Sequence, residues 1–166
     1  MPPEFPTGPV DQRAIEARPD VLTYTTAPFE QDVEVTGPVR VRLWACSSAP
    51  DTDFVARLVD VYPDGRAYNL TDGIVRARFR DGTSASLLEP GRPYAFDIDL
   101  WATSNVFLAG HRVRLQVCSS NFPRWDRNPN TAHAFGQDAE LCPAEQTILH
   151  DAEHPSHIQL PLVPTG

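Results

Sequence analysis

The stretch "VRVRLWA" at residues 39–45 alternates apolar and polar side chains with a period of two. Successive side chains of a β-strand point to opposite sides, so this alternation predicts a strand with one buried face. The expected buried face carries Val39, Val41, Leu43 and Ala45, and the expected exposed face carries Arg40 and Arg42.

Four further segments show the same alternation: "IVRARFR" at 74–80, "FDIDL" at 96–100, "VRLQV" at 113–117 and "IQLPL" at 158–162. Their expected inward side chains are Val75, Ala77 and Phe79, then Phe96, Ile98 and Leu100, then Val113, Leu115 and Val117, and finally Ile158, Leu160 and Leu162. The segment "DFVARLVDV" at 53–61 is apolar on both faces in its first half, which predicts a central strand covered on both sides. Turn sequences such as "PDG" at 63–65 and "EPG" at 89–91 separate these runs.

Helical spacing of apolar residues is not evident anywhere, and seventeen prolines are scattered along the chain. We therefore predict an all-β fold, an antiparallel β-sandwich of jelly-roll type with eight to ten strands. The length of 166 residues fits a single domain over 1–166.

Composition excludes several classes of partner. The formal net charge is −8 and the arginines are dispersed, so nucleic acid is not expected as a partner. No apolar stretch approaches the roughly 20 residues that span a bilayer, and "MPPEFPTGPV" lacks the features of a signal peptide, so no membrane association is expected. Three cysteines are too few for a disulfide scaffold, which favours a reducing, cytoplasmic location.

Two short strings nearly repeat, "VRLWACSS" at 41–48 and "VRLQVCSS" at 113–120. The residues that follow them share no pattern, which argues against an internal repeat. We interpret both as equivalent strand ends, with Cys46 and Cys118 on the outward-facing side and with no catalytic role for the thiols.

Two motifs could carry chemistry. "GTSAS" at Gly82–Ser86 partly matches the nucleophile elbow of α/β-hydrolases, but it lacks the second glycine, and we interpret it as an ordinary polar loop. The tail "HDAEHPSH" supplies zinc-type ligands, although a turn before the last strand accounts for the same letters, and no metal or other cofactor is predicted. Its ligand-type residues are His150, Asp151, Glu153, His154 and His157.

The one long irregular stretch covers residues 119–147, and long loops in compact domains are often functional. Within it, Asn121, Phe122, Arg124 and Trp125 form the candidate contact site. Aromatic rings beside amides and guanidinium groups suit a sugar or a protein partner. The interpretation that we favour for these aromatic rings is an ordered loop in which they plug one end of the sandwich.

Long strings of this sequence resemble the C-terminal domain of the X-Pro dipeptidyl-peptidase and cocaine esterase family of serine hydrolases. The similarity runs through residues 8–80, through "ATSNVFLAGHRVRLQVCSSNFPRWDRNPNT" at 102–131 and through "EHPSHIQLPLV" at 153–163. It implies a jelly roll of the galactose-binding-like kind whose first strands are expected before the "GPVDQR" segment at 8–13. The family's catalytic triad belongs to its α/β-hydrolase domain, so no catalytic residue is carried over.

The resemblance therefore implies a non-catalytic domain of a hydrolase that acts on X-Pro peptides, esters or amides. Its expected partner is the α/β-hydrolase domain, covalently linked or in trans, against which it packs to help wall the active site, and a homodimer is also considered. The alternative is a free-standing β-sandwich module that binds carbohydrate or protein through the loop around Trp125.

Overall fold

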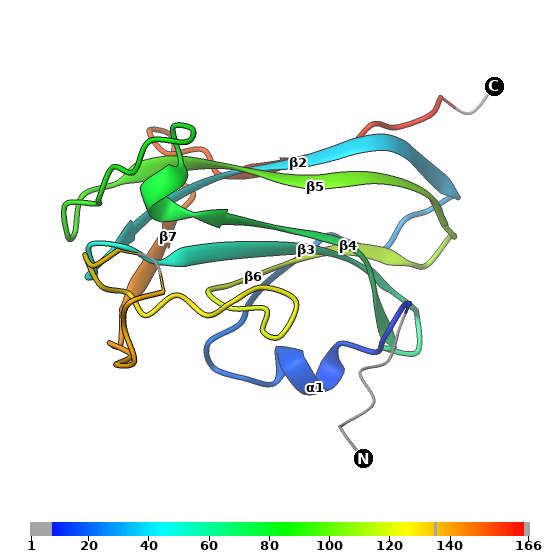
Figure 1. The fold of residues 1–166 in the computed structure, drawn as a ribbon. Helices are drawn as coiled ribbons and strands as arrows, with labels where there is room; N and C mark the ends of the chain where they lie inside the picture. The colour runs from blue at the N-terminus through cyan, green and yellow to red at the C-terminus, as the bar shows by residue number, and fades with distance from the viewer. Residues whose placement is uncertain (1–7, 135, 165–166) are drawn as a thin grey trace, which may run out of the picture.

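The computed structural model describes residues 8–134 and 136–164, and two antiparallel sheets stack face to face in it (Figure 1). One sheet has the strand order β1-β6-β3-β4 and the other has the order β5-β2-β7, with β8 also paired to β2. The first sheet consists of β1 (Leu22–Thr25), β3 (Asp53–Val61), β4 (Ala67–Arg76) and β6 (Arg112–Cys118). The second consists of β2 (Val33–Ser47), β5 (Tyr94–Phe107), β7 (Gln146–Leu149) and β8 (His157–Gln159).

The predicted antiparallel β-sandwich is confirmed. Among the described residues, helical structure is limited to α1 (Arg13–Glu16) and a 3-10 turn, η1 (Ala77–Phe79). Within the described residues, no helix is long and apolar enough to cross a membrane. Residues 1–7, part of the segment expected to lack a signal peptide, lie outside the described residues.

The core lies between the two sheets and contains the side chains that the alternation predicts. All four inward positions of "VRVRLWA" are buried, as are those of "FDIDL" and "VRLQV". Phe54 of β3 and Phe96 of β5 pack against each other between the two sheets, with ring centroids 4.6 Å apart. Burial of one face of each strand is therefore what holds the sandwich together.

Strand β3 is buried along its whole length, as expected for a central strand. Its inner face packs on the other sheet, and its outer face is covered by α1 and by the segment that follows β6 (Figure 1). Gln116 of β6 is buried to 2% exposure on this same outer face, although its place in "VRLQV" predicted an exposed side chain.

The prediction for "IVRARFR" is partly wrong. Strand β4 ends at Arg76, and the next three residues form η1. Arg78 is buried, with its Nε 2.7 Å from Asp51 Oδ2, whereas Phe79 is 39% exposed. Ala77 is buried in the core and Val75 packs against it, as expected, so the prediction fails only at Arg78, which pairs with Asp51, and at Phe79.

The last predicted strand is also shorter than expected. β8 ends at Gln159, and Leu162 makes an isolated bridge to Val35. Leu162 is 61% exposed rather than inward-facing.

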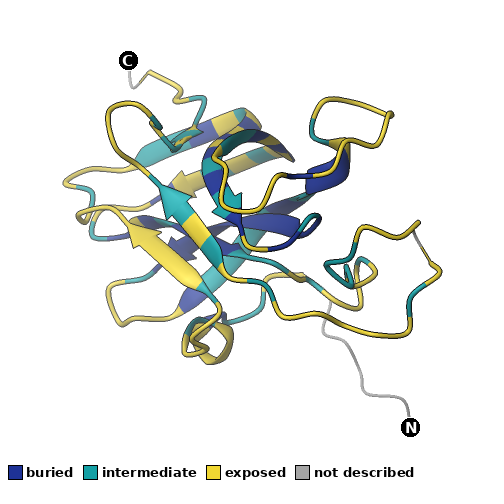
Figure 2. Cartoon of the chain, turned by 90° about the vertical axis from the view of Figure 1, so that its left-hand side faces the viewer, coloured by how far each residue is buried: buried dark blue, intermediate teal, exposed yellow. Residues whose placement is uncertain are grey.

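The two long sides of the sandwich differ. At one side β4 and β5 approach so closely that a Cβ atom on Gly73 would lie 2.0 Å from the carbonyl oxygen of Asp99. The Thr71 hydroxyl also donates a hydrogen bond to the carbonyl oxygen of Leu100 there. At the other side, β1 and β7 flank an opening, and Figure 2 shows β1 exposed throughout.

Candidate functional site

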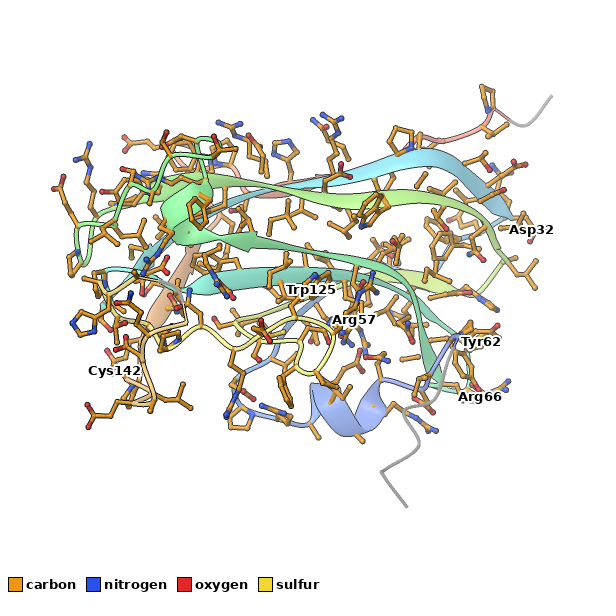
Figure 3. All side chains as sticks on the ribbon, viewed as in Figure 1. Asp32, Arg57, Tyr62, Arg66, Trp125 and Cys142 are labelled. Atoms are coloured by element: carbon orange, nitrogen blue, oxygen red, sulfur yellow. The ribbon has the colours of Figure 1, made fainter. Side chains whose placement is uncertain are left out.

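The irregular segment at residues 119–145 is held on the outer side of the β1-β6-β3-β4 sheet by buried polar groups. Asn121 begins this attachment, because its Oδ1 accepts a hydrogen bond from Arg57 Nη2 at 2.9 Å. Its Nδ2 donates to Asp72 Oδ2, also at 2.9 Å. Figure 3 shows Arg57 and Trp125 on the side of this sheet that faces α1.

Arg57 lies in the middle of β3 and is 8% exposed. Its Nη1 donates to Gln12 Oε1 at 2.9 Å and to Gln116 Oε1 at 3.2 Å. Its Nη2 lies 3.5 Å from Asp72 Oδ2. A buried guanidinium group requires such partners, so this network ties α1, three strands and the loop together.

The other three predicted contact residues do not all lie together. Arg124 places its Nη1 2.5 Å from Asp72 Oδ1, and its guanidinium carbon lies 4.6 Å from the ring centroid of the half-buried Trp125. Phe122 is 62% exposed, and the guanidinium carbon of Arg127 lies 5.5 Å from its ring centroid. Asn121, Arg124 and Trp125 are therefore brought together, whereas Phe122 faces solvent and plugs no part of the core.

A second set of polar contacts fixes the remainder of the loop. Asn128 Nδ2 donates to Asp51 Oδ2 at 2.9 Å and to Asp53 Oδ1 at 2.8 Å. Arg78 donates to the carbonyl oxygens of Thr131 and His133, each at 2.7 Å. The aspartates and Arg78 were not predicted as site residues. Alternation placed Arg78 on the outward face, and Asp51 lies before β3, so the pattern did not indicate their burial.

A cavity of about 470 Å³ lies between this loop and the edge formed by β1 and β6. Leu22, Leu141 and Ile148 supply apolar surface, and Cys118 and Gln146 also line it. Burial raises the pKa of the Cys118 thiol, whose Sγ donates to the carbonyl oxygen of Ser120 at 3.3 Å. A thiol held in its protonated form is a poor nucleophile, so the cavity suits binding rather than covalent chemistry.

The three histidines of the tail segment contact different residues. The ring centroid of His150 lies 6.1 Å from that of Tyr24, and the ring centroid of His154 lies 5.1 Å from that of Trp44. His157 Nδ1 lies 2.7 Å from the carbonyl oxygen of Pro155. In the described part of the chain, no three His, Cys, Asp or Glu side chains are grouped so as to hold a metal ion.

Three histidines pair with aspartates, but none is placed to activate a nucleophile. The pairs are His111 with Asp60, His133 with Asp138, and His154 with Asp151. Among residues 8–134 and 136–164, no serine hydroxyl or cysteine thiol is hydrogen-bonded to a histidine ring. The "GTSAS" segment is an exposed loop in which the Ser86 N–H donates to the carbonyl oxygen of Arg78 at 2.7 Å.

Comparison with known families gives a match over most of the chain. The family described as the X-Pro dipeptidyl-peptidase C-terminal non-catalytic domain matches residues 5–159. Among curated proteins, the cocaine esterase of Rhodococcus sp. (strain MB1 Bresler) is 54% identical over 159 residues. That alignment covers 94% of this chain and 28% of the esterase.

Two solved structures share the fold at substantial identity. An alpha-amino acid ester hydrolase superposes with a TM-score of 0.87 and 36% identity, over 92% of this chain and 27% of the hydrolase. An aminopeptidase from a marine sediment archaeon, Thaumarchaeota archaeon, gives a TM-score of 0.84 and 34% identity, over 93% of this chain and 27% of the aminopeptidase. The chain therefore spans just over a quarter of the length of each of these three proteins.

Proposed function

Because the chain belongs to the family of X-Pro dipeptidyl-peptidase C-terminal non-catalytic domains, we propose that it packs against an α/β-hydrolase domain and helps to shape that domain's active site. The observation that carries the proposal is that residues 5–159 match a family of non-catalytic domains found at the C-terminus of X-Pro dipeptidyl-peptidases. The reaction of the complete hydrolase would be cleavage of X-Pro peptides, esters or amides.

The side chains support an accessory role. An acyl-transfer nucleophile needs activation, for example by an adjacent base, and no described serine or cysteine side chain is hydrogen-bonded to a histidine ring. Burial raises the pKa of the Cys118 thiol, which makes that thiol a weaker nucleophile. The candidate loop, by contrast, is fixed in place by Arg57 and Asp72, so it presents a defined surface. Exposed Phe122 and the Trp125–Arg124 pair are side chains of the kinds enriched in protein interfaces.

A chimera tests the proposal. The chain replaces the matching segment of the Rhodococcus cocaine esterase, to which it is 54% identical. We expect the chimera to hydrolyse cocaine and p-nitrophenyl acetate, with changes in KM that differ between the two esters. The chain alone should hydrolyse neither ester nor an X-Pro-nitroanilide above background.

Two results would contradict the proposal. One is turnover by the chain alone that survives repurification and disappears with a serine-directed inhibitor. The other is a folded chimera whose unmodified hydrolase portion is inactive. The alternative, a free-standing sugar-binding module, predicts glycan binding by the chain alone that is lost in Trp125→Ala, and a glycan-binding screen of both proteins distinguishes it.

A further inference from the structure

The end of the sandwich at which β3 is joined to β4 has a polar hollow of about 390 Å³. Its walls include residues of β3 and β4 from one sheet and of β5 from the other. Figure 3 shows two of the lining residues, Tyr62 and Arg66, at this end of the molecule, far from Cys142. The hollow therefore reaches into the region between the two sheets.

Two polar side chains enter this hollow from strand positions that face the core. Asp60 of β3 pairs with Val113 of β6, and Asn105 of β5 pairs with Val35 of β2. Directly paired residues of antiparallel strands share a face, and both valines belong to the core between the sheets. Asp60 and Asn105 therefore point between the sheets, where a polar group is costly unless it is hydrogen-bonded.

Both side chains have hydrogen-bonding capacity that residues 8–134 and 136–164 do not use. Asn105 Nδ2 is buried and has no hydrogen-bond partner among those residues. Asp60 is 5% exposed, and its Oδ1 lies 2.9 Å from His111 Nδ1, while its Oδ2 is bonded to none of the described side chains. The hollow therefore offers an unused donor, Asn105 Nδ2, beside an unused acceptor, Asp60 Oδ2.

The charge and the walls of the hollow restrict the class of ligand. Among the described lining residues, the aspartate and arginine side chains are those of Asp60 and Arg66. Arg66 Nε lies 2.7 Å from Asp64 Oδ2, so the charge of Arg66 is already balanced. The rings of Tyr62 and Tyr68, with centroids 5.4 Å apart, form an aromatic wall. A carboxylate beside aromatic rings favours an ammonium group.

We propose that the hollow binds an α-amino carbonyl compound with an apolar side group, which is the chemistry of an amino acid amide or a peptide amino terminus. The ammonium group donates to Asp60 Oδ2, and the neighbouring carbonyl oxygen accepts from Asn105 Nδ2. The apolar side group contacts Tyr62, Tyr68 and Leu70. A neutral carbonyl group suits the site better than a free carboxylate, which would bring a second negative charge near Asp60.

The inference does not rest on the proposed function, because the chain alone contains every residue that it uses. NMR titration of the chain with three related compounds tests it. L-leucinamide has the ammonium group, the carbonyl oxygen and an apolar side group. The analogue 4-methylpentanamide lacks the ammonium group, and isopentylamine lacks the carbonyl group.

We expect leucinamide to bind with a Kd on the order of 1 mM, as is usual for so small a ligand. Each analogue should bind at least tenfold more weakly, because it leaves one of the two polar groups without a partner. Leucinamide should also shift the NMR signals of the Asn105 side-chain NH2 group, which report directly on the unused donor.

Two substitutions of aspartate separate the local charge from the overall charge. Asp60→Asn should weaken leucinamide binding at least tenfold and leave 4-methylpentanamide binding unchanged. Asp97→Asn is the matched control, because Asp97 lies on β5 with its side chain 74% exposed and outside the lining of the hollow. It removes the same charge, and leucinamide should bind this variant within twofold of the unmodified chain.

Leucinamide that binds no more tightly than 4-methylpentanamide, or that leaves the Asn105 signals unchanged, overturns the inference. Absence of binding at tens of millimolar also overturns it and means that water alone occupies the hollow. Glucose that binds more tightly than leucinamide, with the Asn105 signals shifted, overturns it in favour of a polyol. If Asp60→Asn does not fold, the comparison of the three compounds on the unmodified chain decides.

Discussion

Arg57 shows how one buried charge can organise several elements. Its guanidinium group reaches Gln12 near α1, Gln116 on β6 and Asn121 in the loop. Removing one member of a buried ion network leaves the others without partners, which costs about 3–5 kcal/mol. We therefore expect Arg57→Ala to lower the free energy of unfolding by about 3 kcal/mol or more, as measured by urea denaturation.

Arg42→Ala is the matched control for Arg57→Ala. Arg42 Nη1 lies 2.9 Å from Asp97 Oδ2, but this pair is on the surface, with side chains 44% and 74% exposed. Exposed ion pairs contribute about 0–1 kcal/mol, so the loss should be under about 1 kcal/mol. Equal losses for the two variants would show that the Arg57 network contributes nothing beyond a surface pair.

The three thiols should differ in reactivity. Cys142 is exposed, whereas Cys118 is partly buried and burial raises the pKa of its thiol. Because the thiolate is the reactive form, variants retaining one cysteine each should react with a thiol reagent at pH 8 fastest at Cys142 and at least tenfold more slowly at Cys118. Faster reaction at Cys118 would identify an activated thiol and contradict the binding interpretation of its cavity.

Serine replacements test the structural role of the cysteines in strand ends. Cys46 and Cys118 both lie on the outward side of their strands and are half-buried. Either single change to serine should lower Tm by less than about 8 °C, since 1 kcal/mol shifts a domain of this size by about 2–4 °C. A larger fall, measured by calorimetry, would mean that the thiol packs in the core.

At the scale of elements, the close approach of β4 and β5 depends on Gly73. A Cβ atom there would lie 2.0 Å from the Asp99 carbonyl oxygen, which is backbone and cannot rotate away. Gly73→Ala must therefore separate the two sheets at their closed side, and we expect a loss of more than about 2 kcal/mol, in the range of severe overpacking. Thermal unfolding monitored by circular dichroism measures it.

Gly65→Ala separates crowding from backbone strain. Gly65 has φ +87°, and a Cβ atom there would meet nothing within 4 Å. Its substitution should cost about 1 kcal/mol from the left-handed conformation alone. A loss at Gly73 no larger than that at Gly65 would show that the sheets accommodate the methyl group.

The elements that could be predicted from the sequence are those whose burial depends on their own alternation. The inward sets of β2, β5 and β6 follow the period of two, and β3 is apolar enough to indicate its central position. Arg78 and Gln116 break the pattern because their burial depends on partners distant in sequence. The candidate loop was located by length and composition, but its attachment through Arg57 and Asp72 requires tertiary contacts that alternation does not encode.

At the scale of the whole molecule, two groups of carboxylates act on acid stability in opposite directions. One group accepts hydrogen bonds from neighbouring side chains or backbone N–H groups, which lowers their pKa values: Asp11, Asp20, Asp64 and Asp138. Their stabilising contribution is present above the unfolded pKa and is lost as pH falls toward the lowered value. Asp60 acts in the opposite direction, because burial raises its pKa, although the hydrogen bond with His111 partly offsets this.

The contribution of Asp60 can be isolated by substitution. Between its unfolded pKa and the raised folded value, the native state binds more protons than the unfolded state, so the unfolding free energy contributed by Asp60 falls as pH rises. The difference in unfolding free energy, wild type minus Asp60→Asn, should therefore decrease from pH 3 upward and then level off. Urea denaturation at half-unit pH steps measures it.

Two further variants assign this pH dependence to burial of Asp60. His111 Nδ1 lies 2.9 Å from Asp60 Oδ1, and this contact lowers the pKa of the Asp60 carboxyl, against the effect of burial. In a His111→Asn background the imidazole that lowers the Asp60 pKa is gone, and burial still raises that pKa. The difference in unfolding free energy between the forms with Asp60 and with Asn at this position should therefore still decrease as pH rises. Asp64, whose pKa is lowered by its hydrogen bonds with Arg66, provides the control: wild type minus Asp64→Asn should rise with pH instead of decreasing. A difference for Asp60→Asn that rises with pH would mean that His111, rather than burial, governs this carboxylate.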